Sequence, residues 1–560
     1  MRVARGLLVL LAAAAVVVAY THRHGDAGGP VATVATAPTK GSVEIVFAYS
    51  SNLEEMMATL VPRFNAAGGE SDGHRIFVRA LAASSGDVEA KIAAGRLHPH
   101  AWSPASSLWG RLLDHEVDRK YVPDENPSLA SSPVVIAMWE PLARALGWPR
   151  RPIGFADILR LATTRSDWAS YGKPTFGKFK LGHTNPDFST SGLSFVAAQY
   201  YAAAGKREGL TVDDVQAPAI RGKVRAIERS IVHYGDTGAF FAEQLAAHGP
   251  GYASAVAMEE TTLLEFNHAR ASHAMKLIAI YPREGTFVTD NPFIVLHAPW
   301  VSAQQRRAAE TFGLWLRAQM TPEVVARFGY RPGDRARRPL SPITRANGVD
   351  PSQPERLLSL PEPRVLARIK TLWREDRKPA NVELVVDVSG SMNDENKIGQ
   401  AVLGLQAFLR QLSARDRVGL MTFNNAPRPI VPIAPFAANS GTLRERVSEL
   451  VADGGTALND AVLAGWKSVD ALNDDRRINA VVVLSDGQDT ASQQRLSAVV
   501  DRLRARANGE GRQIRIFAIA YGSDANTRVL EEIARSSGGK AYTGTPETIE
   551  AVYLQISSFF

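Results

Sequence analysis

The stretch Val382-Glu-Leu-Val-Val-Asp387-Val-Ser389-Gly-Ser391 decides the fold of the C-terminal third of the chain. Its first five residues form an almost wholly apolar run, which predicts a strand buried on both faces of a sheet. Similar runs return at 418–423, 480–484 and 514–520, and a helical pattern at 398–412 follows the first of them. Buried strands that alternate with helices predict an α/β domain, doubly wound and Rossmann-like, around a parallel sheet.

Polar side chains stand where these strands end. Asp387, Ser389 and Ser391 follow the first strand, Thr456 follows two glycines before a helix, and Asp486 follows the run at 480–484. Loops at the carboxyl ends of neighbouring parallel strands converge, so we expect the two aspartates to approach each other. Carboxylates about 4 Å apart repel by roughly 4 kcal/mol at an effective dielectric near 20, which a cation would offset. A ligand set made only of oxygens favours Mg²⁺, with Mn²⁺ or Ca²⁺ as alternatives.

These residues resemble the metal-ion-dependent adhesion site (MIDAS) of von Willebrand factor A (VWFA) domains, whose pattern is D-x-S-x-S, a distant Thr and a distant Asp. Every position of the pattern is filled, by Asp387, Ser389, Ser391, Thr456 and Asp486. The resemblance implies that these five residues bind a divalent cation. It also implies that an Asp or Glu of a protein partner completes the coordination, in a binding module rather than an enzyme.

The region 43–332 alternates short apolar strands with helices, and places small hydroxyl residues at turns that lead into helices. Helix N-termini expose N–H groups that can hold an anion or a polar solute. Segments such as Gly182-His-Thr-Asn-Pro186 and Glu260-Thr-Thr-Leu-Leu-Glu-Phe-Asn267 resemble bacterial extracellular solute-binding proteins.

That resemblance implies a two-lobed, type II periplasmic-binding-protein-like domain with a cleft for a small-molecule or anionic solute. An open alternative is that the cleft has become a protein-docking surface. The candidate cleft residues are Ser50, Ser51, Ser84, Ser85, Trp102, Thr190, Ser191 and Tyr281.

The N-terminus predicts export. Arg2 and Arg5 precede an apolar run from Leu7 to Tyr20, which is shorter than the ~20 residues that a membrane span needs. We therefore expect an extracytoplasmic protein of the cell envelope, secreted or anchored in the membrane by an uncleaved N-terminus. The expected organisation is a signal peptide or anchor at 1–24, a flexible tether at 25–42, a solute-binding-like domain at 43–332, a Pro/Arg-rich linker with a short helix at 333–380, and a VWFA domain at 381–560.

Composition excludes several functions. The 560 residues carry 64 Lys+Arg against 57 Asp+Glu, an excess too dilute to indicate nucleic-acid binding. The absence of cysteine excludes disulfides and thiolate catalysis, and no catalytic motif is found, so we predict a protein that is not an enzyme. Two alternatives remain: the substrate-binding component of an ABC-type transport system, and a VWFA subunit of an ATPase or chelatase complex.

Overall fold

The computed structural model describes residues 38, 40–163, 168–269, 275–507 and 513–560. The predicted signal peptide or anchor at 1–24 and most of the tether at 25–42 lie outside the described residues. Within the described ranges, no helix is long and apolar enough to cross a membrane.

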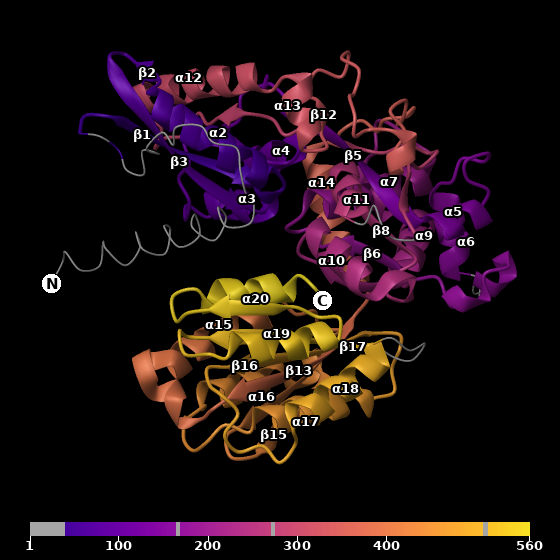
Figure 1. The fold of residues 1–560 in the computed structure, drawn as a ribbon, viewed down its shortest axis with the longest axis vertical. Helices are drawn as coiled ribbons and strands as arrows, with labels where there is room; N and C mark the ends of the chain where they lie inside the picture. The colour runs from indigo at the N-terminus through magenta and orange to yellow at the C-terminus, as the bar shows by residue number, and fades with distance from the viewer. Residues whose placement is uncertain (1–37, 39, 164–167, 270–274, 508–512) are drawn as a thin grey trace.

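Lobe 1, at the upper left of Figure 1, is built on a sheet with the strand order β11-β4-β1-β3-β2. β1 pairs in parallel with β3 and β4, as the alternation of strands and helices predicts. Phe47 of β1 packs against Phe293 and Phe312, so the core includes chain that returns from lobe 2. The elements of lobe 1 are β1 (Val43–Ser50), η1 (Ser51–Leu53), α2 (Glu54–Ala67), β2 (Glu70–Ser71), β3 (His74–Ala83), α3 (Ser85–Ala93), β4 (Ala101–Ser103), α4 (Ser107–Glu116), β11 (Ile294–Val295), α12 (Ala303–Gln319) and α13 (Pro322–Arg327).

Lobe 2 is built around β5, which is buried along its whole length. The strand order is β10-β5-β8-β6-β7, and β9 and β12 also pair with β5. The strands are β5 (Ala130–Trp139), β6 (Leu181–Thr184), β7 (Ile231–Gly235), β8 (Ala255–Glu259), β9 (Leu277–Ile280), β10 (Val288–Thr289) and β12 (Arg331–Pro332). The helices are α5 (Glu140–Ala145), α6 (Phe155–Thr163), η2 (Trp168–Tyr171), η3 (Pro174–Phe176), α7 (Thr190–Ala204), α8 (Val212–Gln216), α9 (Pro218–Glu228), α10 (Gly238–His248), η4 (Gly249–Gly251) and α11 (Glu260–Ala269).

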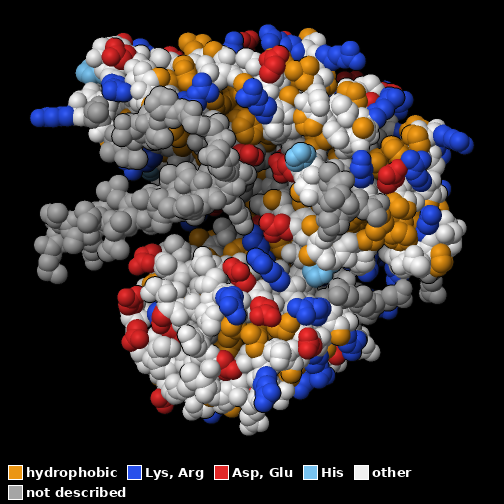
Figure 2. Space-filling view, in the orientation of Figure 1, with side chains coloured by type: hydrophobic (Ala, Val, Ile, Leu, Met, Phe, Trp, Pro, Cys, Tyr) orange, Lys and Arg blue, Asp and Glu red, His pale blue; other side chains and the backbone are white. Residues whose placement is uncertain are grey.

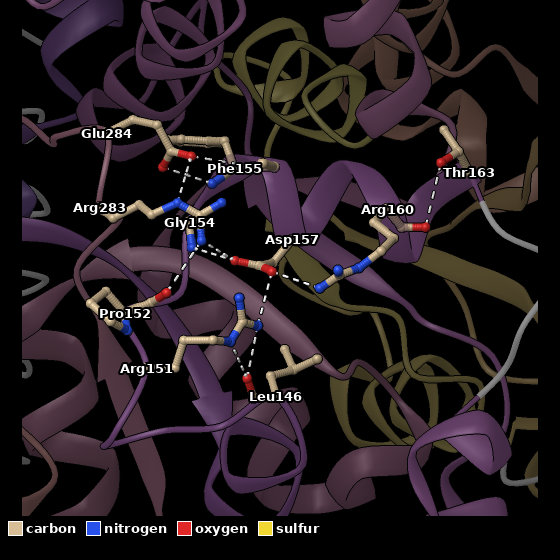
Figure 3. Close-up of polar contacts among 11 residues, drawn as sticks. Leu146, Arg151, Pro152, Gly154, Phe155, Asp157, Arg160, Thr163, Arg283 and Glu284 are labelled. Carbon is tan, nitrogen blue, oxygen red and sulfur yellow. Dashed lines mark hydrogen bonds and ion pairs between the residues drawn. The ribbon is translucent and has the colours of Figure 1, made fainter.

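A buried carboxylate fixes the loop before α6. Asp157 is 2% exposed and accepts hydrogen bonds from Arg151 at 3.0 Å, Arg160 at 2.7 Å, Arg283 at 2.8 Å and the Gly154 amide at 3.1 Å (Figure 3). Arg283 follows β9 closely in the chain, so this cluster links α6 to the central sheet of lobe 2.

The segment expected to be a linker packs on lobe 2. Ile343 and Val349 are each 2% exposed, and the Gly348 carbonyl accepts a hydrogen bond from the Ala279 amide of β9 at 2.8 Å. A short turn, η5 (Arg345–Asn347), lies within this stretch. The apolar side chains at 343 and 349 therefore cover lobe 2 instead of facing solvent.

The helix predicted near the end of the linker is α14 (Pro363–Asp376), and it contacts both lobes. Leu366 is fully buried in the core of lobe 1, and the Lys370 ammonium lies 5.3 Å from the ring centre of Trp109. Trp373 donates its indole N–H to Glu228 of lobe 2 at 3.1 Å. α14 then leads directly into the first strand of the C-terminal domain.

The C-terminal domain, the lower body in Figure 1, has a six-stranded sheet in the order β15-β14-β13-β16-β17-β18. All neighbours are parallel except β15, and β13 pairs with β16 in a register that sets Val386 opposite Leu484. Alternate residues of β13 face two different cores, so helices cover both faces of the sheet. The elements are β13 (Ala380–Asp387), η6 (Gly390–Asn396), α15 (Lys397–Gln411), β14 (Arg417–Phe423), β15 (Pro427–Pro435), α16 (Phe436–Ser448), α17 (Leu458–Asp470), β16 (Ile478–Ser485), α18 (Leu496–Ala507), β17 (Ile514–Tyr521), α19 (Thr527–Ser536), β18 (Ala541–Gly544) and α20 (Ile549–Ser557).

The C-terminal domain docks on lobe 2. The Phe559 ring lies 5.0 Å from Phe240 of α10 and 4.4 Å from Phe517 of β17, between centroids. Asn185 donates to the Ser558 carbonyl at 3.1 Å, in the same contact region.

Acidic and basic side chains are interspersed over the face shown in Figure 2, with several Asp and Glu side chains along the left edge of the C-terminal domain.

Candidate functional site

The carboxyl ends of β13 and β16 bring the predicted metal-binding residues together. Asp387 is the last residue of β13, and Asp486 directly follows the neighbouring strand β16. The loop before α17 joins them, because the Gly390 amide donates to the Gly454 carbonyl at 2.9 Å. Asp387 and Asp486 are each 0% exposed, so two carboxylates are buried at this edge.

Asp387 is held by hydrogen bonds on both oxygens. The Ser389 amide donates to Oδ1 at 2.8 Å, and the Ser485 hydroxyl donates to Oδ2 at 2.6 Å. Burial raises the pKa of Asp387 to about 6, the bonds from Ser389 and Ser485 work against that increase, and the charge of Asp486 adds to it. The site therefore contains negative charge that the protein neutralises incompletely.

The hydroxyls predicted as ligands converge on the same point. Ser389 Oγ lies 3.1 Å from Ser391 Oγ, and Ser391 donates to Asp486 Oδ1 at 2.8 Å. Gly487 lies between the loops: a Cβ atom there would be 3.5 Å from Thr456 Oγ1 and 3.8 Å from Ser391 Oγ. All five predicted residues thus meet at one edge of the sheet.

A buried lysine contacts this group. Lys397 is 3% exposed, and its ammonium donates to Asp486 Oδ2 at 2.7 Å and to Asp524 Oδ1 at 2.9 Å. Burial lowers the pKa of Lys397, but the hydrogen bonds to Asp486 and Asp524 outweigh burial and the pKa is raised. One of the two buried acids therefore has a fixed positive partner.

In the N-terminal region, the two lobes touch where the cleft was predicted. The Gly86 amide of lobe 1 donates to the Phe188 carbonyl of lobe 2 at 3.0 Å, and a Cβ at Gly86 would lie only 2.2 Å from the Asp187 carbonyl oxygen. The Trp109 indole donates to Thr190 Oγ1 at 2.7 Å across the same contact. Thr190 is therefore occupied by a side chain of the other lobe.

The remaining predicted cleft residues divide into three groups. Ser50, Ser51 and Ser84 lie at the ends of β1 and β3, at the boundary between strand and helix. Ser85 accepts a hydrogen bond from the Ala105 amide at 3.0 Å, and Ser191 lies 3.0 Å from Thr184 Oγ1. The hydroxyls of Ser85 and Ser191 thus take part in contacts within their own lobes.

Trp102 and Tyr281 lie away from that group. Trp102 is fully buried in the core of lobe 1 with Val88 and Leu108. Tyr281 donates to Glu260, and it lines a cavity of about 740 Å³ between lobe 2 and the segment 345–356. We therefore place Trp102 in the core and Tyr281 at a separate hollow of lobe 2.

Comparison with known proteins assigns two regions of the chain. Residues 45–331, more than half of the 560, match the family described as bacterial extracellular solute-binding protein. The chain belongs to this family. Residues 381–553 match the von Willebrand factor type A domain, so this member of the solute-binding family carries a VWA domain after it.

Relatives match the chain to different extents. The inter-alpha-trypsin inhibitor heavy chain H4 of Homo sapiens is 30% identical over 186 residues, which is 32% of this chain and 19% of that protein. This chain thus spans about a fifth of that relative. An uncharacterized protein of Mycobacterium tuberculosis is 23% identical over 99% of this chain and 83% of its own length. A periplasmic thiamin binding protein aligns with a TM-score of 0.42 and 10% identity over 60% of this chain and 98% of that one.

The oxygen atoms at the VWA edge fit a hard divalent cation. Two carboxylates and three hydroxyls converge, an all-oxygen set that suits such an ion, and its positive charge would offset the repulsion between Asp387 and Asp486. Within the described part of the chain, no group of three or more His, Asp or Glu residues is gathered as a metal site.

Several residues of both regions were not predicted from the sequence. At the VWA edge these are Ser485, Lys397 and Asp524, of which only Ser485 had a sequence signal, because it directly precedes Asp486. Between the lobes, Asn52 Nδ2 lies 3.4 Å from Glu259 Oε2 and 3.3 Å from Asn291 Oδ1. Burial raises the pKa of Glu259 to about 7, although the bond from Asn52 works against the increase. A polar group therefore lies next to the contact between the lobes.

Proposed function

We propose that this chain is a non-enzymatic binding protein of the cell envelope whose VWA domain holds a divalent cation and, through it, an acidic residue of a protein partner. The observation that carries the proposal is the convergence of Asp387, Ser389, Ser391, Thr456 and Asp486 at one edge of the sheet. Mg²⁺ is the first candidate, and Mn²⁺ or Ca²⁺ would use the same oxygens. Membership of an extracellular family supports a location outside the cytoplasm.

The chemistry at this site is coordination. Asp387 and the hydroxyls of Ser389 and Ser391 would hold the cation, with Thr456 and Asp486 completing the protein's share. A bound divalent cation supplies a positive centre that an Asp or Glu of another protein can fill. The hydrogen bonds from Ser389 and Ser485 orient Asp387 for this role.

The experiment is a calorimetric titration of the protein with Mg²⁺, followed by capture of partners from envelope extracts with and without EDTA. Asp387→Ala removes a central carboxylate, so we expect heat of binding to vanish and metal-dependent capture to be lost. The matched control is Asp453→Ala, because Asp453 is exposed and only its backbone contacts the site. Wild-type protein that binds no divalent cation would refute the proposal.

The solute-binding domain is proposed to hold or sense a small solute between its lobes, with Asn52 and Glu259 beside the cleft. A second candidate function, delivery of that solute to an ABC-type permease, is favoured by the family match. Titration with sulfate, molybdate and cationic solutes separates both of these solute-binding functions from the alternative that the cleft has become a protein-docking surface. A transport component binds one of them tightly whether or not Mg²⁺ is present, whereas a cleft that has become a docking surface binds none.

A further inference from the structure

Lys397 is a buried side chain that forms part of the site at the carboxyl edge of the VWA sheet. It is the first residue of α15 and 3% exposed, and its carbonyl accepts a hydrogen bond from Tyr521 at 2.9 Å. Gly522 makes room for its ammonium: the glycine has φ = 88°, and a Cβ there would lie 2.9 Å from Lys397 Cε. A larger residue at 522 would push the end of the lysine side chain aside, and the positive φ there also favours glycine.

The two carboxylate oxygens of Asp486 accept hydrogen bonds from different groups. Oδ2 accepts from Lys397 at 2.7 Å, whereas Oδ1 accepts from Ser391 at 2.8 Å. Among the residues that the structure describes, Asp387 has no such cationic partner: its oxygens accept from the neutral groups of Ser389 and Ser485. The two buried acids are therefore unequal, since one is paired with a cation and the other is not.

Asp524 is a second carboxylate that pairs with the Lys397 ammonium. Its side chain is 53% exposed and lies 2.9 Å from the same ammonium, which thus shares its charge between a buried acid and an exposed one. Removal of Asp524 would leave the full charge of Lys397 directed at Asp486. Removal of Lys397 would leave Asp486 with its whole negative charge.

We propose that Lys397 is a positioning residue that limits the contribution of Asp486 to cation binding and neutralises Asp486 when no cation is bound. The inference rests on the proposed metal site and states what regulates its affinity. Lys397 weakens the affinity for the cation and stabilises the domain when no cation is bound. Because Lys397 partly neutralises Asp486, a cation bound mainly by Asp387 is less neutralised by the protein. It can therefore attract an acidic group of a partner more strongly. Asp524 sets how strongly the lysine acts.

The test compares Lys397→Met and Asp524→Asn by calorimetric titration with Mg²⁺ at pH 8, where the carboxylates stay ionised, and by thermal melting with and without Mg²⁺. For Lys397→Met we expect the dissociation constant for Mg²⁺ to fall at least tenfold, and the melting temperature of the metal-free protein to fall as well. For Asp524→Asn we expect the dissociation constant to rise severalfold. A purely structural role of Lys397 would not change the dissociation constant for Mg²⁺ in opposite directions in the two variants.

Two controls sharpen the result. Lys397→Arg keeps the charge and should leave the dissociation constant within about threefold of wild type. Asp453→Asn removes an exposed acid near the site that does not contact Lys397, and measures the effect of net charge alone. Should Lys397→Met fail to fold, Asp524→Asn still decides the direction.

The outcomes separate the inference from the proposed function. Wild-type binding of Mg²⁺ that Asp387→Ala abolishes and Lys397→Met leaves unchanged or weakens would overturn the inference alone. No Mg²⁺ binding in either wild type or Lys397→Met would overturn both. Binding that appears only in Lys397→Met would refute the proposed function for the wild-type chain but support the inference, because the lysine would then be what prevents the wild-type site from taking the ion.

Discussion

Glu383 is the one ionisable side chain in the apolar part of β13. It is 2% exposed and accepts a hydrogen bond from Ser468 at 3.3 Å. Burial raises its pKa to about 8, with the bond from Ser468 lowering it less. In the folded protein Glu383 is therefore protonated at neutral pH, four residues before Asp387, the first candidate ligand and the last residue of β13.

This burial predicts a pH dependence of stability. The unfolded chain ionises Glu383 from about pH 4.5, whereas the folded chain keeps the proton up to about pH 8, so the free energy of unfolding decreases as pH rises between these values. Each unit of pKa difference is worth about 1.4 kcal/mol. Glu383→Gln should remove that decrease, and urea denaturation at pH 5 and pH 9 measures it. The exposed Glu445→Gln is the control, and equal effects of both variants at pH 9 would contradict the prediction.

Asp157 has the opposite behaviour. Burial favours a raised pKa, but the Gly154 amide and the guanidinium groups of Arg151 and Arg283 outweigh it, so the pKa of Asp157 is lowered (Figure 3). Its stabilisation is present at neutral pH and is lost as pH falls through the folded pKa. Asp157→Asn should lower the free energy of unfolding by about 3 kcal/mol at pH 7. In urea denaturation the difference from wild type should shrink below pH 4, and a difference independent of pH would count against this account.

At the scale of elements, apolar runs predicted β13, β14, β16 and β17 of the VWA sheet, but not the antiparallel edge strand β15 or the short strand β18. The run predicted at 382–388 is β13 (Ala380–Asp387), and the run at 514–520 is β17 (Ile514–Tyr521). Such runs locate strands because a strand covered on both faces has few polar positions. The convergence of Asp387 and Asp486 followed from the same step, since parallel neighbours end at one edge.

Tertiary contacts explain what the sequence could not predict. The prolines of the segment after β12 indicated a solvated linker, but Ile343 and Val349 pack on lobe 2, a surface that exists only once β9 is in place. Lys397 looked like an ordinary helix residue, because Asp524 meets it from 127 positions further along the chain. Trp102 was predicted in the cleft from its flanking residues, whereas its ring belongs to the core of lobe 1.

At the scale of the whole molecule, the docking of the VWA domain on lobe 2 predicts one cooperative unfolding transition in calorimetry. Phe559 joins the two, since its ring packs on Phe240 of lobe 2 and on Phe517 of the VWA domain. Phe559→Ala should cost about 3–5 kcal/mol and split the transition into two. Phe560→Ala is the matched control, because that ring packs on Phe408 and Phe517 of the VWA domain. It should destabilise the protein without splitting the transition, so identical scans for the two variants would show that Phe559 does not couple the domains.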